Sequence, residues 1–226
     1  MSGEDLLAGH PLQTAPRKYS EETVNQITHG AGFLLSLIGG FVLCRFVWLH
    51  DDAWQIVGCT IYSASLVALY AASTLSHSFE RESARHFWRI TDQICIFLLI
   101  AGTYTPFGLR YMREPIYQVL LAVIWLMALL GIYFKIFHAK RQNVATAAYV
   151  ILGWLPILAI RPILERLPLP AFGWILAGGL LYTVGTFFLT HDDKVPYFHG
   201  LWHLLVISAS ICHYIAILFY VAGWQP

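Results

Sequence analysis

Charged side chains are scarce in this sequence, because only 12% of its 226 residues are Asp, Glu, Lys or Arg. Soluble globular domains contain about 25% of these residues, whereas 58% of this chain is hydrophobic. This composition indicates that most of the folded chain is not surrounded by water. The net charge is +1 and the basic residues are scattered. The sequence therefore lacks the basic patch of a nucleic-acid-binding protein, and we expect no nucleic-acid partner.

Paired cysteines and a cleavable leader are also missing. All four cysteines lie inside apolar runs, without the C-x-x-C spacing of a thiolate metal site or a redox pair. We interpret them as small buried residues. The first 19 residues are polar, contain Pro and Gly, and lack the basic-then-apolar pattern of a signal peptide. We therefore expect residues 1–19 to remain as a flexible tail.

Long apolar runs are abundant. A helix needs about 20 predominantly apolar residues to cross the hydrocarbon core of a membrane. Seven stretches meet this requirement, near residues 30–49, 54–79, 87–109, 115–137, 144–164, 171–190 and 198–222. Because the connectors are short, neighbouring spans should run antiparallel. The expected fold is all-α: a polytopic integral membrane protein in which residues 20–226 form a single seven-helix transmembrane domain.

The distribution of basic residues indicates an orientation. The side shared with the tail carries Arg17, Lys18, Arg81, Arg85, Arg89, Lys135, Lys140, Arg141 and Lys194. The other side carries Arg45, Arg110, Arg113, Arg161 and Arg166. Cytoplasmic loops of membrane proteins are enriched in Lys and Arg. We therefore expect a cytoplasmic N-terminus and a C-terminus outside.

Polar residues from three spans fall at one depth, near the expected cytoplasmic face. Ser73 and His77 are one helical turn apart in the second span. Asp92 lies about one turn into the third span, and His199 and His203 share a face at the start of the seventh. Ionisable side chains inside a membrane are costly, so they face the bundle interior and have partners. These residues should therefore meet.

Three imidazoles and a carboxylate at one level can be partners through a metal. Neutral imidazole is a good ligand of Zn²⁺, and three His ligands leave the fourth tetrahedral position open for water, as in catalytic sites. The pKa of such a water falls to about 7. We predict a Zn²⁺ site at His77, His199 and His203. Asp92 would orient or deprotonate the water, and the Ser73 hydroxyl would bond a ligand, the water or a substrate carbonyl.

Each of these residues also has a simpler interpretation. His77 is placed to act as an interfacial or capping residue, and two histidines four positions apart recur by chance. Asp92 could pair with Arg85 or Arg89 near the interface. Ser73 could bond a carbonyl of its own helix. Their joint occurrence at one depth favours the metal site.

Other polar residues in or near the spans have different expected roles. His29, which begins the first span, and Asn25, one turn before it, are candidates for support of the metal site. His213 lies ten residues after His203, nearly on the opposite face of its helix, and should bond a neighbouring helix. The run "AGTYTPF" at 101–107 predicts a break at Pro106, where Thr and Tyr satisfy the freed carbonyls.

The combined motifs resemble the hemolysin III family, within the wider progestin and adipoQ receptor (PAQR) group of seven-span membrane proteins. They are "EETVNQITHG", the S-x-x-x-H of Ser73 and His77, "TDQICIFLLIAGTYTPF" with Asp92, and the H-x-x-x-H of His199 and His203. The resemblance runs from about residue 19 to the C-terminus. It implies a zinc ion held by the three histidines, with Asp92 and Ser73 close to it.

The resemblance implies a fold more firmly than an activity. The receptor branch and the related alkaline ceramidases resemble lipid amide hydrolases that use zinc-bound water. The bacterial branch, which this compact chain resembles most, takes its name from a cytolytic activity, and some members are linked to membrane homeostasis. This branch implies the bacterial inner membrane as location and a membrane lipid as partner.

Three functional hypotheses follow. The first is a zinc-dependent lipid amide hydrolase. The second is a non-enzymatic protein with a structural zinc that senses or adjusts lipid state or permeabilises membranes. The third is a transporter, which usually has broken spans and a polar site near the midplane. The crowding of polar residues at one end argues against the third hypothesis.

Overall fold

The structure is a computed structural model that describes residues 15–50, 52–137 and 142–225. The helices are α1 (Ala15–His50), α2 (Ala53–Ser76), α3 (Glu82–Tyr111), α4 (Pro115–Phe137), α5 (Gln142–Trp154), α6 (Ile160–Arg166), α7 (Leu169–Leu189) and α8 (Phe198–Ala216). A 3₁₀ segment, η1 (Leu155–Ala159), joins α5 to α6, and a π-helical segment, η2 (Ile217–Val221), extends α8.

Seven helical segments in the described residues are long and apolar enough to cross a membrane. The expected all-α seven-helix fold is thereby confirmed. Residues 1–14 of the expected flexible tail lie outside the described part of the chain. Residues 15–19 are already helical, because α1 begins at Ala15 and continues without interruption into the first span.

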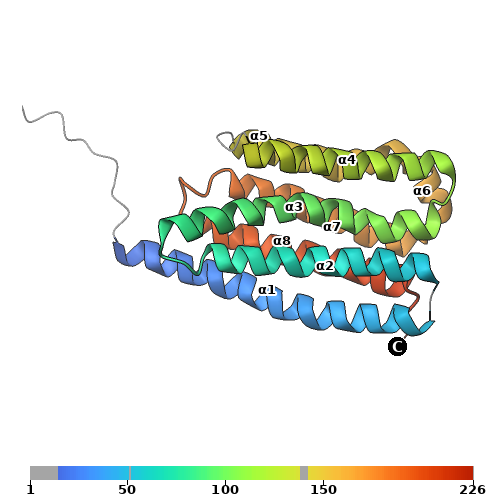
Figure 1. Cartoon of the computed structure of the whole chain (residues 1–226), viewed down its shortest axis with the longest axis horizontal. Helices are drawn as coiled ribbons and strands as arrows, with labels where there is room; N and C mark the ends of the chain where they lie inside the picture. The colour runs from blue at the N-terminus through green and yellow to red at the C-terminus, as the bar shows by residue number, and fades with distance from the viewer. Residues whose placement is uncertain (1–14, 51, 138–141, 226) are drawn as a thin grey trace, which may run out of the picture.

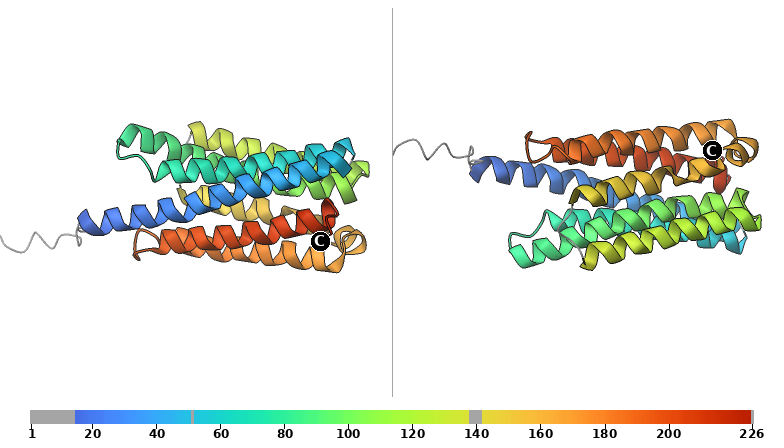
Figure 2. Two further views of the ribbon diagram at one scale, coloured as in Figure 1. Left: turned by 90° about the horizontal axis from the view of Figure 1, so that it is seen from below. Right: turned by 90° about the horizontal axis from the view of Figure 1, so that it is seen from above.

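The helices run side by side along one long axis (Figure 1). The start of α1, the α2–α3 connection and the α7–α8 connection lie together at one end, which we call the site end. The α1–α2 and α3–α4 connections and the C-terminus lie at the opposite end, the far end. Helix α1 contacts both α2 and α8, and Figure 2 shows it crossing between them. Three helices therefore converge at the site end.

Polar contacts close the far end of the bundle. Asp52 caps α2 by accepting a hydrogen bond from the Gln55 amide at 3.0 Å, as N-cap residues do. It also pairs with Arg113 at 2.9 Å, and this hydrogen bond from Arg113 lowers the pKa of the Asp52 carboxyl. Arg166 pairs with Glu114. The first pair connects the beginning of α2 to the α3–α4 turn, and the second connects that turn to α6.

Two prolines shape the spans differently from the sequence expectation. Helix α3 continues past Pro106 to Tyr111, so the proline lies within the helix. The expected continuous span over 144–164 is instead interrupted by η1, which contains Pro156. Proline removes a backbone donor and clashes with the preceding turn, and a transmembrane break is tolerated where neighbouring groups satisfy the freed carbonyls. Here the Tyr104 hydroxyl of α3 donates to the carbonyl of Gly153, just before the break.

Candidate metal centre

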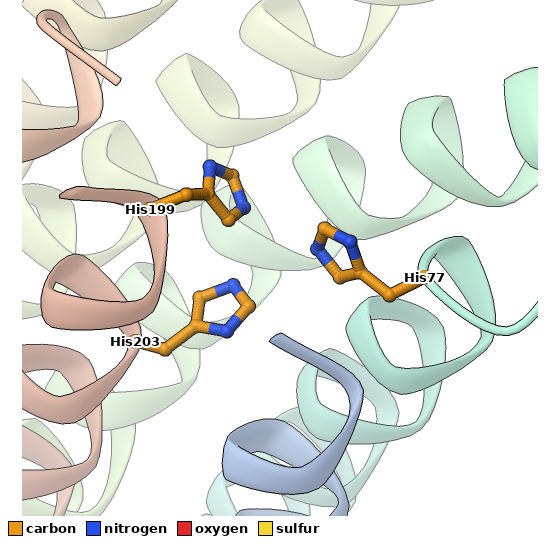
Figure 3. A group of neighbouring side chains, drawn as sticks. All are labelled: His77, His199 and His203. Atoms are coloured by element: carbon orange, nitrogen blue, oxygen red, sulfur yellow. The ribbon is translucent and has the colours of Figure 1, made fainter. Parts of the chain in front are cut away.

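The three histidines predicted to meet lie together at the site end. His77 is the residue that follows α2, and His199 and His203 lie in the first turns of α8. One ring nitrogen of each lies within 4.8 Å of the others, close enough for one metal ion to bridge them. The ring centroid of His77 is 5.0 Å from that of His199 and 5.2 Å from that of His203. Figure 3 shows the imidazoles facing a common space from α2 and α8.

Carboxylates fix the orientation of two of these rings. Nδ1 of His77 lies 2.7 Å from Oε2 of Glu22 in α1, and Nδ1 of His199 lies 2.6 Å from Oδ2 of Asp192 in the α7–α8 connection. A carboxylate accepts hydrogen bonds, so each Nδ1 carries the proton and donates it. The Nε2 lone pair of each ring is then available, as in the carboxylate–histidine pairs that support metal ligands.

A hydroxyl plays the same part for the third ring. Nδ1 of His203 lies 3.1 Å from Oγ1 of Thr28. The Thr28 hydroxyl donates its own hydrogen to the Val24 carbonyl at 2.9 Å, so its oxygen accepts from the imidazole. The Nε2 lone pair of His203 is therefore also available. All three rings thus adopt the same tautomer, with the protonated nitrogen directed at a supporting residue.

The available nitrogens are short of partners within the protein. Among the described residues, Nε2 of His199 and Nε2 of His203 are buried without a hydrogen-bond partner. An unsatisfied buried acceptor is costly, and an ion shared by these nitrogens would remove that cost. Burial lowers the pKa of His77, which favours its neutral imidazole, the form that binds metal. The donor set therefore fits a divalent metal that accepts imidazole nitrogen.

Asp92 and Ser73 lie beside this cluster and are connected to it. Ser73 lies next to Asp92, and its hydroxyl oxygen lies 2.6 Å from Nδ1 of His29. The His29 ring stacks on His203 with 3.4 Å between centroids and 16° between planes. Oδ1 of Asp92 is buried without a partner among the described residues. This carboxylate oxygen therefore lacks a hydrogen bond within the described part of the chain.

The simpler interpretation of Asp92 as an interfacial ion-pair partner is wrong. Arg85 and Arg89 both lie near Glu22, at 3.6 Å and 3.8 Å from its Oε1. Ser73 is fully buried and its hydroxyl contacts the His29 ring of α1, so it does more than bond its own helix. His29 lies beside the cluster, where it stacks on His203 and contacts Ser73.

A cavity of about 320 Å³ opens beside the cluster. Two of the histidines, His77 and His199, line it together with Asp92. Its other polar lining includes Glu21, Glu22, Asn25, Ser76, Arg89, Gln93, Asp192 and Asp193. Asp92 therefore lines the same cavity as two of the three rings.

Sequence reasoning missed the residues that orient the rings: Glu22, Thr28 and Asp192. The expected first span began at residue 30, whereas α1 begins at Ala15. Glu22, Asn25 and His29 recur at intervals of three and four, and residues at these intervals share one face of a helix. That periodicity was the signal for a functional helix face. Asp192 lies in a connector and has no comparable signal.

Comparison with known proteins agrees with these motifs. A family model described as "Haemolysin-III related" matches residues 17–214. The chain is 43% identical over 202 residues to "Hemolysin-3" of Bacillus cereus, covering 89% of this chain and 92% of that protein. It is 40% identical over 201 residues to "Hemolysin-3 homolog" of Bacillus subtilis, covering 88% and 94%.

A human relative also matches. "Monocyte to macrophage differentiation factor" of Homo sapiens is 32% identical over 207 residues, covering 89% of this chain and 84% of that protein. The family model spans most of the chain, and the bacterial relatives are matched over nearly their whole lengths. The chain belongs to the hemolysin III family of integral membrane proteins.

Proposed function

We propose that this protein binds Zn²⁺ through His77, His199 and His203 and hydrolyses an amide bond of a membrane lipid. The observation that carries the proposal is the arrangement of unused polar atoms around the cavity. Imidazole lone pairs without protein partners and the available carboxylate oxygen of Asp92 lie in one region of the site end. A catalytic metal site needs such ligands together with a base near the open position.

The donor set is typical of a catalytic zinc. Zinc held by three imidazoles keeps a fourth position for water and lowers the pKa of that water to about 7. Glu22, Asp192 and Thr28 hold the three rings in the tautomer that presents Nε2. These three contacts would therefore keep the rings directed at a shared ion.

Asp92 has the position of a general base and acid. In amide hydrolysis a water oxygen adds to the carbonyl carbon, the C–N bond breaks, and a carboxylic acid and an amine form. We assign to Asp92 the transfer of a proton from the water to the leaving nitrogen through its available oxygen. Ser73 lies beside this carboxylate. His29 in turn contacts Ser73 and stacks on His203, which couples the base to a ligand.

An apolar chamber next to the polar cavity supports a lipid substrate. This inner chamber, of about 100 Å³, shares Ile96, Tyr149, Leu189 and Trp202 with the cavity that holds Asp92. His29 also lines it. A substrate with a polar group at the metal and an apolar chain in the chamber would match this change of lining. Pockets with mostly apolar walls and a few placed polar groups are typical of small-molecule sites.

The direct test is release of fatty acid from a long-chain N-acyl amide by the purified protein in lipid vesicles. We expect release that a zinc chelator stops and that added Zn²⁺ restores. Absence of release from amides of several chain lengths, by protein shown to contain zinc, would contradict the hydrolase.

The membrane location follows the same proposal. The distribution of basic residues supports a cytoplasmic site end, and the bacterial relatives support the inner membrane. A periplasmic reporter fused to the C-terminus should then be active, whereas a cytoplasmic reporter there should be inactive.

A structural zinc in a non-enzymatic protein is the second candidate function. The cluster joins α1, α2 and α8 through Glu22, His77, His199, His203 and Thr28, so an ion there would fasten three helices. Such a protein could act in lipid sensing, membrane homeostasis or permeabilisation. It would lose stability without zinc but would show no turnover. The Asp92 variant described in the Discussion separates the two candidates.

Removing the carboxylate that holds His77 should weaken metal binding. We expect Glu22→Gln to lower zinc affinity about 10–100-fold, the usual effect of losing a residue that orients a metal ligand. Competition with a chromogenic chelator measures this affinity in the purified protein. Glu165→Gln is the matched control, because Glu165 pairs with the exposed Arg161 outside the cluster. Equal affinities in both variants would show that Glu22 does not support a bound metal.

A further inference from the structure

His213 of α8 is a buried polar residue that the metal centre does not use. Its side chain is buried, and Nε2 lies 3.1 Å from the carbonyl oxygen of Ile175 in α7. The expected bond to a neighbouring helix is thus confirmed. Among the described residues, Nδ1 of His213 is buried without a hydrogen-bond partner. The ring fits because residue 178 of α7 is glycine, and a Cβ there would collide with the imidazole.

The contact with Ile175 determines what Nδ1 can do. A carbonyl oxygen only accepts, so Nε2 carries the hydrogen and donates it. A neutral imidazole has one N–H, which makes the remaining nitrogen an acceptor. Nδ1 is therefore a buried lone pair that lacks a donor. Because an unsatisfied buried acceptor is costly, this nitrogen indicates a ligand that carries an O–H or N–H group.

Two apolar chambers meet at His213. One is the inner chamber described above, and the other, which we call the far chamber, has a volume of about 320 Å³. The far chamber lies beside the break at η1, and Pro156 and Ile157 form part of its wall. Its described lining contains no Asp, Glu, Lys or Arg. The space is therefore suited to an uncharged, largely apolar molecule.

Two of the other polar side chains in this wall are already engaged in hydrogen bonds, and a third, Tyr117, lies under the Arg166 guanidinium. The Tyr104 hydroxyl donates to the Gly153 carbonyl, and the Trp154 indole N–H donates to Oγ1 of Thr183 at 3.0 Å. Both donors are therefore already used in hydrogen bonds within the protein. The lone pair of His213 is the buried, unpartnered acceptor of this lining that would select a ligand able to donate a hydrogen bond.

We propose that the far chamber binds a lipid-derived alcohol, whose hydroxyl donates to Nδ1 of His213 and whose alkyl chain occupies the chamber. The volume lies at the lower end of the 300–1,000 Å³ range of small-molecule pockets, which suits one alkyl chain. A carboxylate lacks the donor that Nδ1 requires, and an ammonium would lack a counter-charge in this lining. The site is separate from the histidine cluster, so the proposal does not rest on amide hydrolysis.

A brominated alcohol tests the proposal in the purified full-length chain. An ω-brominated undecanol is titrated into the protein in detergent, and quenching of tryptophan fluorescence by bromine reports its approach. Trp154 lines both chambers, so the quenching that Trp154→Phe removes is the signal from this site. The comparison ligand is the methyl ether of the same alcohol, which has the same chain but no hydrogen to donate.

Two variants test separately the hydrogen bond to His213 and the volume of the chambers. His213→Phe keeps a ring but removes the acceptor. Gly179→Leu fills the chambers, because Gly179 lines both of them and a Cβ there meets no atom within 4 Å. Gly173→Leu is the matched control, since Gly173 is equally unobstructed but lines neither chamber.

We expect the wild type to bind the alcohol roughly tenfold more tightly than the ether, the value of one good buried hydrogen bond. His213→Phe should bind both ligands equally, Gly179→Leu should bind neither, and Gly173→Leu should resemble the wild type. Equal binding of alcohol and ether by the wild type would overturn the role of His213. Unchanged binding by Gly179→Leu, or no quenching at Trp154, would overturn the location. The comparison of alcohol and ether in the wild type tests the role of His213 even if His213→Phe does not fold.

Discussion

Asp92→Asn is expected to keep the zinc content of the protein and to reduce release of fatty acid from a long-chain amide by about 10²–10⁴-fold. This is the range that positioned acid–base groups contribute to catalysis. Asn has nearly the shape of Asp and keeps an oxygen that accepts hydrogen bonds. It cannot take up a proton from water at neutral pH. The variant therefore removes proton transfer at residue 92 while it preserves the packing of the side chain.

Asp193→Asn is the matched control for this experiment. Asp193 lines the same cavity but is exposed, so its replacement should leave turnover within about twofold of the wild type. Two measurements are needed together, the zinc content and the initial rate. Full turnover by Asp92→Asn would contradict the general-base role. A loss of zinc in this variant would show that Asp92 supports the metal rather than the reaction.

His203→Ala should remove the dependence of thermal stability on zinc. A ligand present at a thousandfold excess over its Kd stabilises the folded state by about 4 kcal/mol. For a chain of this size, 1 kcal/mol moves Tm by roughly 2–4 °C. A strong chelator should therefore lower the Tm of the wild type by about 10 °C. It should have no effect on His203→Ala, whose Tm should already be low because the substitution also leaves His29 without its stacking partner.

His86→Ala serves as the control for the stability measurement. His86 is exposed near the start of α3 and belongs to neither the cluster nor the cavity. Its Tm should fall on chelation as far as that of the wild type. An equal response of His203→Ala and the wild type to the chelator would mean that the metal, if present, binds elsewhere.

The sequence was sufficient to predict which histidines meet because membrane burial restricts where ionisable residues occur. His77, His199, His203 and Asp92 all interrupt apolar spans, and the antiparallel order of the spans assigns them to one end. The structure places them there. The same logic predicted the contact of His213 with another helix. In each case a polar residue in an apolar helix needs a partner from a neighbouring helix.

The supporting residues were harder to predict for a physical reason. Glu22 and Thr28 lie in a stretch too polar to count as a membrane span, yet α1 carries that stretch as regular helix into the site. Asp192 reaches His199 from a connector, whose path depends on tertiary packing. The break at η1 was missed because hydropathy reports the length of an apolar run and not its backbone geometry. Pro156 marked the position, but proline is also tolerated inside a transmembrane helix, as Pro106 is here.

Elemental analysis of the purified protein tests the central claim most directly. Protein extracted in mild detergent without chelator should contain about one zinc per chain. His77→Ala and His203→Ala, purified in parallel, should each contain less than about a tenth of that amount, because each loses one of three ligands. A wild type that carries no more metal than these two variants would contradict a metal centre at the site end.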